Sequence, residues 1–320
     1  MSTTSFAATR SIRSSARSSR KIRPTASRRS RRAFEATLTI DAAIRRAAAA
    51  LEASSTPALD ARVLAKAAFG LDDATLIAQG DRIAAPEALA RYGDMIARRA
   101  AGEPVAHIVG RREFWSLDIE VAPPILVPRA DSETIVEAVV RRRAPGAPLK
   151  ILDLGCGSGA LLCALLAAFP KAVGVGVDVN PEAVALTSRN LLRLGFGLQS
   201  SATVGDWFAA VDGRFEVIVS NPPYLRTVDR DILPREVRDF EDPGALFSGE
   251  DGLDAHRLLM ADAPRHIAPG GLFVVEFGEG QLPAINDLAR RAFPGAEGKA
   301  ENDLSGRPRA FVIDLGAHSD

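Results

Sequence analysis

The sequence contains few cysteines and no long apolar run, and both absences restrict what the protein can be. Only two of its 320 residues are cysteine, Cys156 and Cys163, which lie seven positions apart. Two thiols cannot form a disulfide framework, and this spacing fits no zinc motif, so we interpret them as small packing residues. No stretch of about 18 consecutive apolar residues occurs, so no membrane-spanning helix is expected.

Acidic side chains are absent from residues 1–34, although this segment contains ten arginines and lysines. Its Ser/Arg-rich composition, with almost no apolar periodicity, predicts a disordered basic tail over residues 1–35. Three interpretations of the tail stay open: a cleaved mitochondrial presequence, a basic arm that touches RNA or ribosomes, and an over-long start assignment.

The remaining residues are net acidic, even though the formal charge of the whole chain is zero. After the tail, 40 acidic side chains stand against 30 basic ones, because ten of the 40 basic residues lie in the tail. A protein that binds nucleic acid normally presents a basic face to the phosphates. We therefore expect no stable binding of nucleic acid by the body of the protein.

Helices are expected over residues 36–110, in segments that begin near Ile40, Pro57 and Pro86. Gly70 follows the second segment as a helix C-cap. Such a bundle can be a structural cap or a surface that grips a partner. Residues 111–130 then alternate apolar and polar side chains, which predicts a β-hairpin linker. We place the turn of this hairpin at the paired prolines, Pro123 and Pro124.

Segments typical of strands alternate with segments typical of helices over residues 131–320, which predicts a parallel sheet covered by helices on both faces. The sequence offers six strand segments: KILDLG, AVGVGVDV, SATVGDWF, FEVIVS, GLFVVEFG and RAFVIDLG.

A glycine-rich turn, DLGCGSG, follows the first of these strands and opens a helix. Glycine permits positive φ and a close approach of the backbone to a ligand. The spacing is G-x-G-x-G rather than the G-x-G-x-x-G of dinucleotide folds, and an acid precedes the first glycine. S-adenosylmethionine carries a sulfonium and an ammonium group instead of a pyrophosphate, so a nearby acid favours this ligand. The candidate donor-binding residues of the turn are Asp153, Gly155, Cys156, Gly157, Ser158 and Gly159.

Acids also follow the next two strands. Asp178 ends GVGVDV and could accept hydrogen bonds from vicinal ribose hydroxyls, although a charge at a helix N-terminus is the alternative. Asp206 and Trp207 follow the third strand and could hold the adenine by hydrogen bonding and stacking. Core packing is the alternative for Trp207.

The fourth strand ends in Asn221, Pro222, Pro223 and Tyr224. Prolines cannot donate a backbone hydrogen bond and so end the strand, and ligands of open α/β sheets bind beyond that end. The Asn221 side-chain oxygen and the Pro222 carbonyl could accept both N–H groups of an amide or exocyclic amine, whose nitrogen is a poor nucleophile. The prolines would keep these acceptors aimed, and Tyr224 could pack beside the planar group. This motif predicts the class of reaction and leaves the substrate open.

Further stretches make the sequence resemble the release factor glutamine methyltransferases, the HemK/PrmC family. The resemblance covers about residues 38–315. The stretches occur in family order: GEPVAHIVGRREFWSLDIEV, LVPRADSETIVE, DLGCGSGAL, VGVDVNPEAVALTSRN, GDWF, IVSNPPYL, SGEDGLDAHRLL and PGGLFVVEFGEGQ.

The resemblance implies an α/β fold, a seven-stranded Rossmann-like class I methyltransferase domain with an antiparallel last strand, behind a small helical bundle and a hairpin linker. It implies methyl transfer from S-adenosylmethionine to the side-chain amide nitrogen (N5) of the glutamine in the Gly-Gly-Gln loop of peptide chain release factors. By motif, Asn221, Pro222 and Tyr224 would be catalytic, and the whole tetrapeptide would contact the glutamine. Arg129 and Glu133 would shape the site.

Two departures from the family pattern accompany the resemblance: Ala130 replaces a usual proline, and residues 240–243 read Phe-Glu-Asp-Pro. A glutamine methyltransferase acting on a ribosomal protein, and an adenine N6 methyltransferase acting on nucleic acid, stay open as alternatives. We expect a monomer in the cytoplasm, or in mitochondria if the tail is a presequence. The histidines have no metal-like grouping, so no metal is expected.

Overall fold

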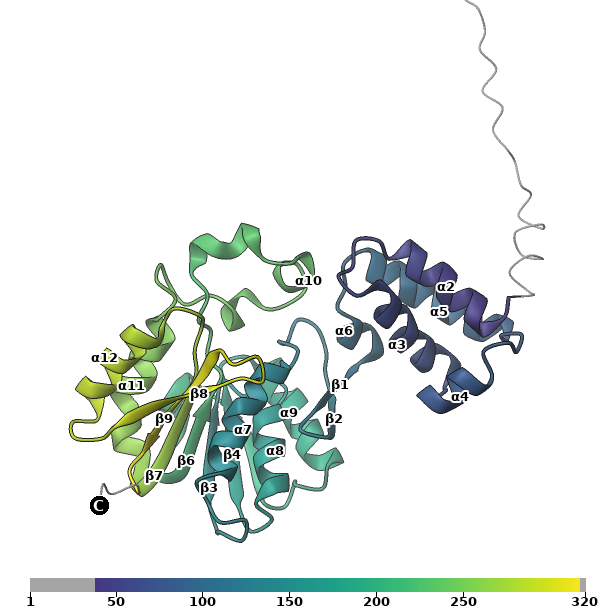
Figure 1. The fold of residues 1–320 in the computed structure, drawn as a ribbon. Coiled ribbons are helices and arrows are strands. Elements are labelled where there is room, and N and C mark those ends of the chain that lie inside the picture. Colours follow the sequence, from purple (N-terminus) through teal and green to yellow (C-terminus); the bar gives the residue numbers. More distant parts are fainter. Residues whose placement is uncertain (1–37, 317–320) are drawn as a thin grey trace, which may run out of the picture.

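The computed structural model describes residues 38–316, so the predictions for the basic tail lie outside the described residues. A bundle of short helices stands beside a larger α/β part (Figure 1). The bundle consists of α2 (Ile40–Ala50), α3 (Pro57–Phe69), α4 (Asp73–Ala78), α5 (Pro86–Ala100) and α6 (Val105–Val109). The three predicted helices are confirmed. The sequence reading missed α4 and α6, which have six and five residues and are too short to show a helical period.

Local capping sets the ends of the first two helices. The Thr39 hydroxyl accepts a hydrogen bond from the Ala42 amide at 3.2 Å and so begins α2. Gly70 adopts a φ of 68° after α3, in the left-handed region that favours glycine. Inside the bundle the Tyr92 hydroxyl donates to the Ala61 carbonyl at 2.8 Å, which ties α5 to α3.

A β-hairpin follows the bundle, but its turn is not where the prolines predicted it. Strands β1 (Arg111–Phe114) and β2 (Leu117–Glu120) pair antiparallel, with Trp115 and Ser116 in the turn. The turn residues have φ of 52° and 59°. Glycine and asparagine are the residues that usually indicate such a turn in a sequence, and neither occupies these two positions. Two carboxylates stabilise the turn instead: the distant Glu133 accepts a hydrogen bond from the Trp115 amide at 2.8 Å, and Glu113 of β1 accepts one from the Ser116 amide at 2.6 Å.

A seven-stranded sheet forms the centre of the larger part, in the order β5-β4-β3-β6-β7-β9-β8. Its last strand, β9, runs antiparallel to both neighbours, and the other described pairings are parallel. The predicted fold class is therefore confirmed. The strands are β3 (Lys150–Leu154), β4 (Val173–Asp178), β5 (Ser200–Val204), β6 (Phe215–Ser220), β7 (Ile267–Glu276), β8 (Gly298–Asn302) and β9 (Pro308–Asp314). The sequence reading missed β8, whose GKAEN lacks β-branched and aromatic residues.

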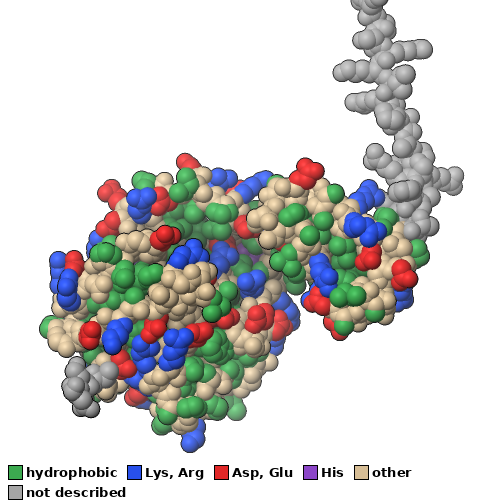
Figure 2. Space-filling view, in the orientation of Figure 1, with side chains coloured by type: hydrophobic (Ala, Val, Ile, Leu, Met, Phe, Trp, Pro, Cys, Tyr) green, Lys and Arg blue, Asp and Glu red, His purple; other side chains and the backbone are tan. Residues whose placement is uncertain are grey.

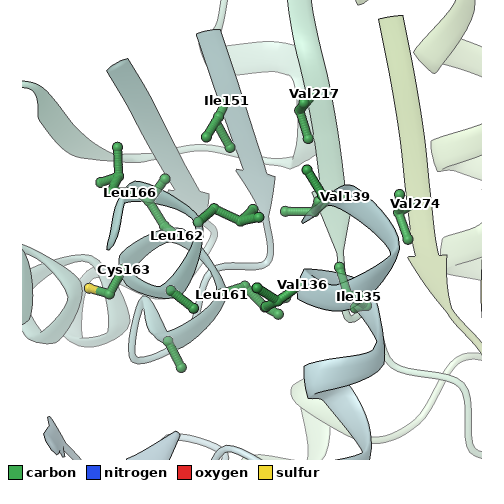
Figure 3. Close-up of a cluster of buried hydrophobic side chains, with 14 of the residues drawn as sticks. Ile135, Val136, Val139, Ile151, Leu161, Leu162, Cys163, Leu166, Val217 and Val274 are labelled. Atoms are coloured by element: carbon green, nitrogen blue, oxygen red, sulfur yellow. The ribbon is translucent and has the colours of Figure 1, made fainter. Parts of the chain in front are cut away.

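Helices cover both faces of this sheet (Figure 1). One face carries α7 (Glu133–Val140), α8 (Ala160–Ala168) and α9 (Pro181–Arg193), and the other carries α11 (Asp254–His266) and α12 (Leu282–Ala292). Alternate strand residues enter opposite cores: Val217 packs with α7 and α8, whereas Ile218 packs with the second pair of helices. Figure 3 shows Val217 beside Val139 and Val274 in the first core.

One long connection reaches from the sheet back to the helical bundle. It lies between β6 and α11 and contains η3 (Thr227–Ile232), α10 (Arg235–Arg238) and η4 (Pro243–Ala245). Arg99 of α5 is nearly buried; it contacts Asp60 at 2.6 Å within the bundle and Glu236 of α10 at 2.5 Å. This ion pair links the bundle to the connection that follows the Asn-Pro-Pro-Tyr segment.

Two features are absent from residues 38–316. No helix there has the length and apolarity needed to cross a bilayer, and no group of three or more His, Cys, Asp or Glu side chains is arranged to hold a metal ion.

Candidate active site

The glycine-rich turn joins β3 to α8 and exposes backbone at the carboxyl end of the sheet. Gly155, Gly157 and Gly159 have φ of 70°, 56° and 76°, which is the conformation that favours glycine. A Cβ on Gly159 would lie 2.8 Å from the Thr187 side chain, so close packing also requires glycine there. Gly155 and Gly157 line an adjacent cavity and Gly159 does not.

This cavity has a volume of about 200 Å³ and lies beyond the ends of β3, β4, β5 and β6. We call it the donor cavity. Of the predicted donor-binding residues, it is lined by Gly155, Cys156, Gly157, Ser158, Asp178, Asp206, Trp207 and Asn221. The structure thus brings together residues that are far apart in the sequence, as expected for strand ends that meet at one edge of a parallel sheet.

Asp178 is held in a fixed orientation at the edge of the donor cavity. One carboxylate oxygen accepts from the Gly157 amide at 2.8 Å, and the other accepts from the Asn180 amide at 2.9 Å. Burial raises the pKa of Asp178, whereas these two backbone hydrogen bonds favour the ionised form. Each oxygen keeps a further lone pair, so the carboxylate can also accept from ligand hydroxyls.

The charges around the donor cavity select against phosphate. Three carboxylates line it, those of Asp178, Asp206 and Asp242, and no Lys, Arg or His side chain is among its lining residues. A pyrophosphate would be repelled, whereas a sulfonium and an ammonium group would be attracted. The donor set therefore fits S-adenosylmethionine better than a dinucleotide.

Asp153 lies beneath the donor cavity rather than in its wall. Its side chain is fully buried, one oxygen accepts from the Leu162 amide at 3.2 Å, and the other has no protein partner. Burial raises the pKa of Asp153 to about 7. A buried oxygen without a protein partner fits a contact with an ammonium group through water, since such an atom costs free energy until something binds it.

Trp207 combines the two roles that the sequence left open. Its ring lies against Gly155, where an added Cβ would sit 3.6 Å from the indole, and its other surroundings belong to the core under α11 and α12. The backbone of Trp207 has a φ of 48°, an unusual value for a large side chain. It starts η2 (Trp207–Ala210), which directs the indole toward the donor cavity.

The Asn-Pro-Pro-Tyr segment separates the donor cavity from a second cavity of about 170 Å³. We call the second one the acceptor cavity. Asn221, Leu126 and Ala245 line both cavities, and only Asn221 among them has a polar side chain. The Asn221 amide nitrogen donates to the Ser132 hydroxyl at 2.9 Å, which leaves its oxygen free to accept.

Pro222, Tyr224 and Arg129 line the acceptor cavity, and Pro223 lines the donor cavity. Glu241, which lies outside the Asn-Pro-Pro-Tyr segment, fixes the orientation of the Arg129 side chain. One guanidinium nitrogen of Arg129 contacts both oxygens of the buried Glu241, at 2.7 and 2.6 Å. Glu241 belongs to the Phe-Glu-Asp-Pro departure noted in the sequence. Figure 2 shows hydrophobic side chains gathered in the depression beneath the α10 segment.

Several residues at the site were not predicted from the sequence. Phe114, Ser132 and Asp242 line the donor cavity, and Val237 of α10 lines the acceptor cavity. Phe114 and Ser132 lie in stretches that carry the family resemblance, and Asp242 lies in the Phe-Glu-Asp-Pro departure, but the sequence did not indicate that these side chains reach the cavity. Glu133 was expected to shape the site, but it lines neither cavity and stabilises the hairpin turn instead.

The burial and the contacts of the cysteines and of two histidines indicate structural roles. Both cysteines are buried and free, and Cys156 also lines the donor cavity, with its sulfur 3.4 Å from the Thr187 hydroxyl. His107 is buried 3.0 Å from the Ile125 carbonyl, and His256 is buried 2.8 Å from the Glu276 carbonyl.

Comparison with known proteins gives consistent matches. A family model described as the PrmC N-terminal domain matches residues 42–110, and one described as the methyltransferase small domain matches residues 129–235. The release factor glutamine methyltransferase of Rhodospirillum rubrum is 42% identical over 258 residues, which are 80% of this chain and 78% of that protein. The protein of the same name from Bradyrhizobium diazoefficiens is 42% identical over 256 residues, 79% of this chain and 86% of that one.

Among solved structures, a release factor-specific protein-(glutamine-N5) methyltransferase from Alicyclobacillus acidocaldarius matches with 25% identity and a TM-score of 0.37. The match covers 61% of this chain and 97% of that chain.

Proposed function

This chain belongs to the release factor glutamine methyltransferase family, and on that premise we propose that it transfers a methyl group from S-adenosylmethionine to the side-chain amide nitrogen, N5, of a glutamine in peptide chain release factors. The proposed acceptor is the glutamine of the Gly-Gly-Gln loop. Methylation at that position would modulate translation termination.

One observation carries this proposal: a single polar side chain, Asn221, stands between an acid-lined cavity and a mostly apolar one. The first cavity suits a cationic donor, and the second suits a planar, uncharged acceptor group. A methyl transfer requires the two ligands to meet at one atom pair, and the wall that contains Asn221 is the place where they can meet.

S-adenosylmethionine supplies an electrophilic methyl group on a cationic sulfur, so the reaction needs no strong base from the protein. We assign its contacts to the turn over residues 153–159, to Asp178, Asp206 and Trp207, and to Asn221. In this assignment Asp178 accepts hydrogen bonds from the ribose, and Trp207 stacks on the adenine. The burial of Asp153 limits it to a contact through water.

The residues of the acceptor cavity orient the glutamine amide nitrogen, which is a poor nucleophile. The Asn221 oxygen and the Pro222 carbonyl accept the two N–H groups of the glutamine amide, which aims its nitrogen lone pair at the methyl group. Pro222 and Pro223 limit the motion of the backbone that carries these acceptors. Tyr224 and Arg129 form the wall of the cavity against which the amide packs.

The excess of acidic over basic side chains after the N-terminal tail argues against a nucleic-acid substrate. Residues 35–320 contain 40 acidic and 30 basic side chains, and the charge of Arg129 in the acceptor cavity is neutralised by Glu241. An adenine methyltransferase would need basic surface to hold phosphates close to the site.

The test is mass spectrometry of release factor peptides after incubation with the full-length protein and S-adenosylmethionine. We expect a mass increase of one CH₂ group on the Gly-Gly-Gln peptide, and none when that glutamine is changed to asparagine. An unmodified glutamine would contradict the proposal. Ribosomal proteins are assayed in parallel, because a ribosomal protein is the alternative substrate of a glutamine methyltransferase. A variant that lacks residues 1–34 should retain its activity on the release factor.

A further inference from the structure

A buried carboxylate holds the arginine of the acceptor cavity in place. Arg129 lines that cavity, and its partner Glu241 has a side chain that is only 1% exposed. One guanidinium nitrogen of Arg129 donates to both carboxylate oxygens, at 2.7 and 2.6 Å. One of these oxygens also accepts from the Val127 amide at 3.3 Å. A charge buried away from water requires such partners, so the ion pair fixes the guanidinium at the cavity wall.

Backbone hydrogen bonds fix the chain on both sides of this ion pair. The Glu241 amide donates to the Val237 carbonyl at 3.2 Å, and Val237 of α10 also lines the acceptor cavity. The Asp242 amide donates to the Pro124 carbonyl at 2.8 Å, which joins the connection after β6 to the linker that carries Arg129. The carboxylate that holds the guanidinium is thus itself held, and the orientation of Arg129 is set before a substrate binds.

Most of the hydrogen-bond donors of Arg129 are left unused. A guanidinium has five N–H groups and no acceptor. Within residues 38–316 the hydrogen bonds of Arg129 all come from one of its nitrogens, the one that contacts Glu241. The side chain is 40% exposed, and most of the other residues that line the cavity are apolar. When a substrate fills the cavity and displaces water, the remaining N–H groups require an acceptor atom from that substrate.

We propose that Arg129, positioned by Glu241, binds a main-chain carbonyl oxygen of the Gly-Gly pair that precedes the acceptor glutamine. The inference rests on the proposed function, because it concerns the same substrate. Glycine has no Cβ, so a Gly-Gly segment can bring its carbonyl groups closer to a protein wall than other residues can. Arg129 would then select a glutamine by the chain that carries it, whereas Asn221 and Pro222 select the amide.

The glutamine side-chain oxygen is a poorer partner for Arg129. A hydrogen bond to that oxygen would draw electron density from the amide nitrogen, because the two atoms share one delocalised system. It would weaken the nucleophile that methyl transfer needs. The exposed fractions agree with this argument, since Glu241 lies on the buried side of the ion pair and Arg129 on the open side. The glutamine side chain must enter the cavity, and its main chain stays at the opening.

The first experiment compares the wild type with Arg129→Lys at saturating donor. Lysine keeps the charge that the buried Glu241 requires but lacks the planar fork of donors. KM for the release factor should rise about tenfold and kcat should stay within about threefold, because a contact to the main chain is present in the ground state and the transition state alike. Arg143→Lys is the matched control: Arg143 pairs with Asp314 at 3.1 Å and lines neither cavity.

The second experiment changes the substrate and keeps the wild-type enzyme. Two release factors are made in which an ester replaces one amide bond, either between the two glycines or between the second glycine and the glutamine. An ester carbonyl is a weaker acceptor than an amide carbonyl. One of the two esters should raise KM about threefold or more with the wild type and leave KM of Arg129→Lys unchanged, because the lysine variant has already lost the contact.

Glu241→Gln tests the positioning role. The glutamine oxygen can still accept from Arg129, but one of the two contacts is lost and the remaining bond has a neutral acceptor, so KM for the release factor should rise about threefold. In the Arg129→Lys background the same substitution should add less than about twofold, because Glu241 acts through Arg129. Donor Kd, measured by calorimetry, should stay within about twofold in every variant, and thermal unfolding confirms that each is folded.

The outcomes separate this inference from the proposed function. An unchanged KM in a folded Arg129→Lys would overturn it, and so would equal KM values for the ester and amide release factors with the wild type. The ester result decides the question even if the lysine variant does not fold. Effects of Glu241→Gln and Arg129→Lys that multiply would remove the positioning role of Glu241. If the wild type itself leaves the release factor unmethylated, the proposed function fails instead.

Discussion

The donor and acceptor cavities share a wall but are built in different ways. The donor cavity consists mainly of backbone turns at four strand ends, each encoded by a short local motif. The acceptor cavity depends on contacts between distant segments: Arg129 and Glu241 are 112 positions apart, and Ser132 and Asn221 are 89 apart. Local motifs can thus specify donor binding, whereas acceptor geometry exists only in the folded chain.

This difference predicts that substitutions will divide into two kinetic classes. Changes in the donor turns should alter donor affinity, and changes in the network around Asn221 should alter turnover or the use of the acceptor. The predictions below test that division, from the largest expected effect to the smallest.

Asn221→Ala should lower kcat by about 100-fold or more, because an aimed polar contact at the reacting centre is removed. Donor affinity should change much less. Steady-state kinetics and calorimetric donor binding check this, with Asn286→Ala on α12 as the control that lines neither cavity. A large loss of donor binding with unchanged turnover would refute the assigned role.

Asp178→Ala should weaken donor binding by about 10- to 100-fold, since hydrogen bonds to a charged group contribute about 1.5–3 kcal/mol. The kcat at saturating donor should stay within a few-fold of the wild-type value. Titration calorimetry with S-adenosylhomocysteine gives the affinity, and Asp287→Ala on α12 is the matched control. Equal donor affinity in the variant and the wild type would remove Asp178 from the donor site.

Glu236→Gln should raise KM for the release factor roughly two- to fivefold, as expected for a partly exposed ion pair. Its partner Arg99 links the helical bundle to α10, where Val237 lines the acceptor cavity. Donor affinity should not change. Asp231→Asn, in the same connection, is the control, and a KM indistinguishable from the wild type would show that this link does not position the acceptor wall.

Ala130→Pro should have the smallest effect, a stabilisation of about 0.5 kcal/mol from reduced unfolded-chain entropy. Arg129 is already extended, with φ −97° and ψ 143°, which is the conformation that the residue before a proline adopts. Ala130 is exposed and starts η1 (Ala130–Ser132). Thermal unfolding checks the prediction, and marked destabilisation would mean that this departure from the family pattern is required here.

Much of the fold and of the donor cavity could be predicted from the sequence, because both rest on periodicity and on glycine conformation. The strand ends at Asp178 and Asn221 lie beside the glycine turn as the parallel sheet requires. The hairpin turn was misplaced because the carboxylates of Glu113 and Glu133, rather than a glycine or asparagine, stabilise its positive φ values. Strand β8 was missed because its residues have low β-propensity and pair only with β9.

The acceptor network could not be predicted for a related reason. Ser132 reads as a helix cap, yet it makes no capping hydrogen bond and contacts Asn221 instead. Glu276 reads as one residue of an apolar strand, and nothing in FVVEFG indicates that Tyr224 contacts it. Pairings of this kind depend on which strands become neighbours in the sheet.

The most direct measurement is a crystal structure of the full-length protein with S-adenosylhomocysteine and a glutamine-containing release factor peptide. Our account predicts the glutamine amide nitrogen in the acceptor cavity, within about 2.6–3.2 Å of both the Asn221 side-chain oxygen and the Pro222 carbonyl. A glutamine bound elsewhere, or an Asn221 oxygen turned toward Ser132, would contradict it.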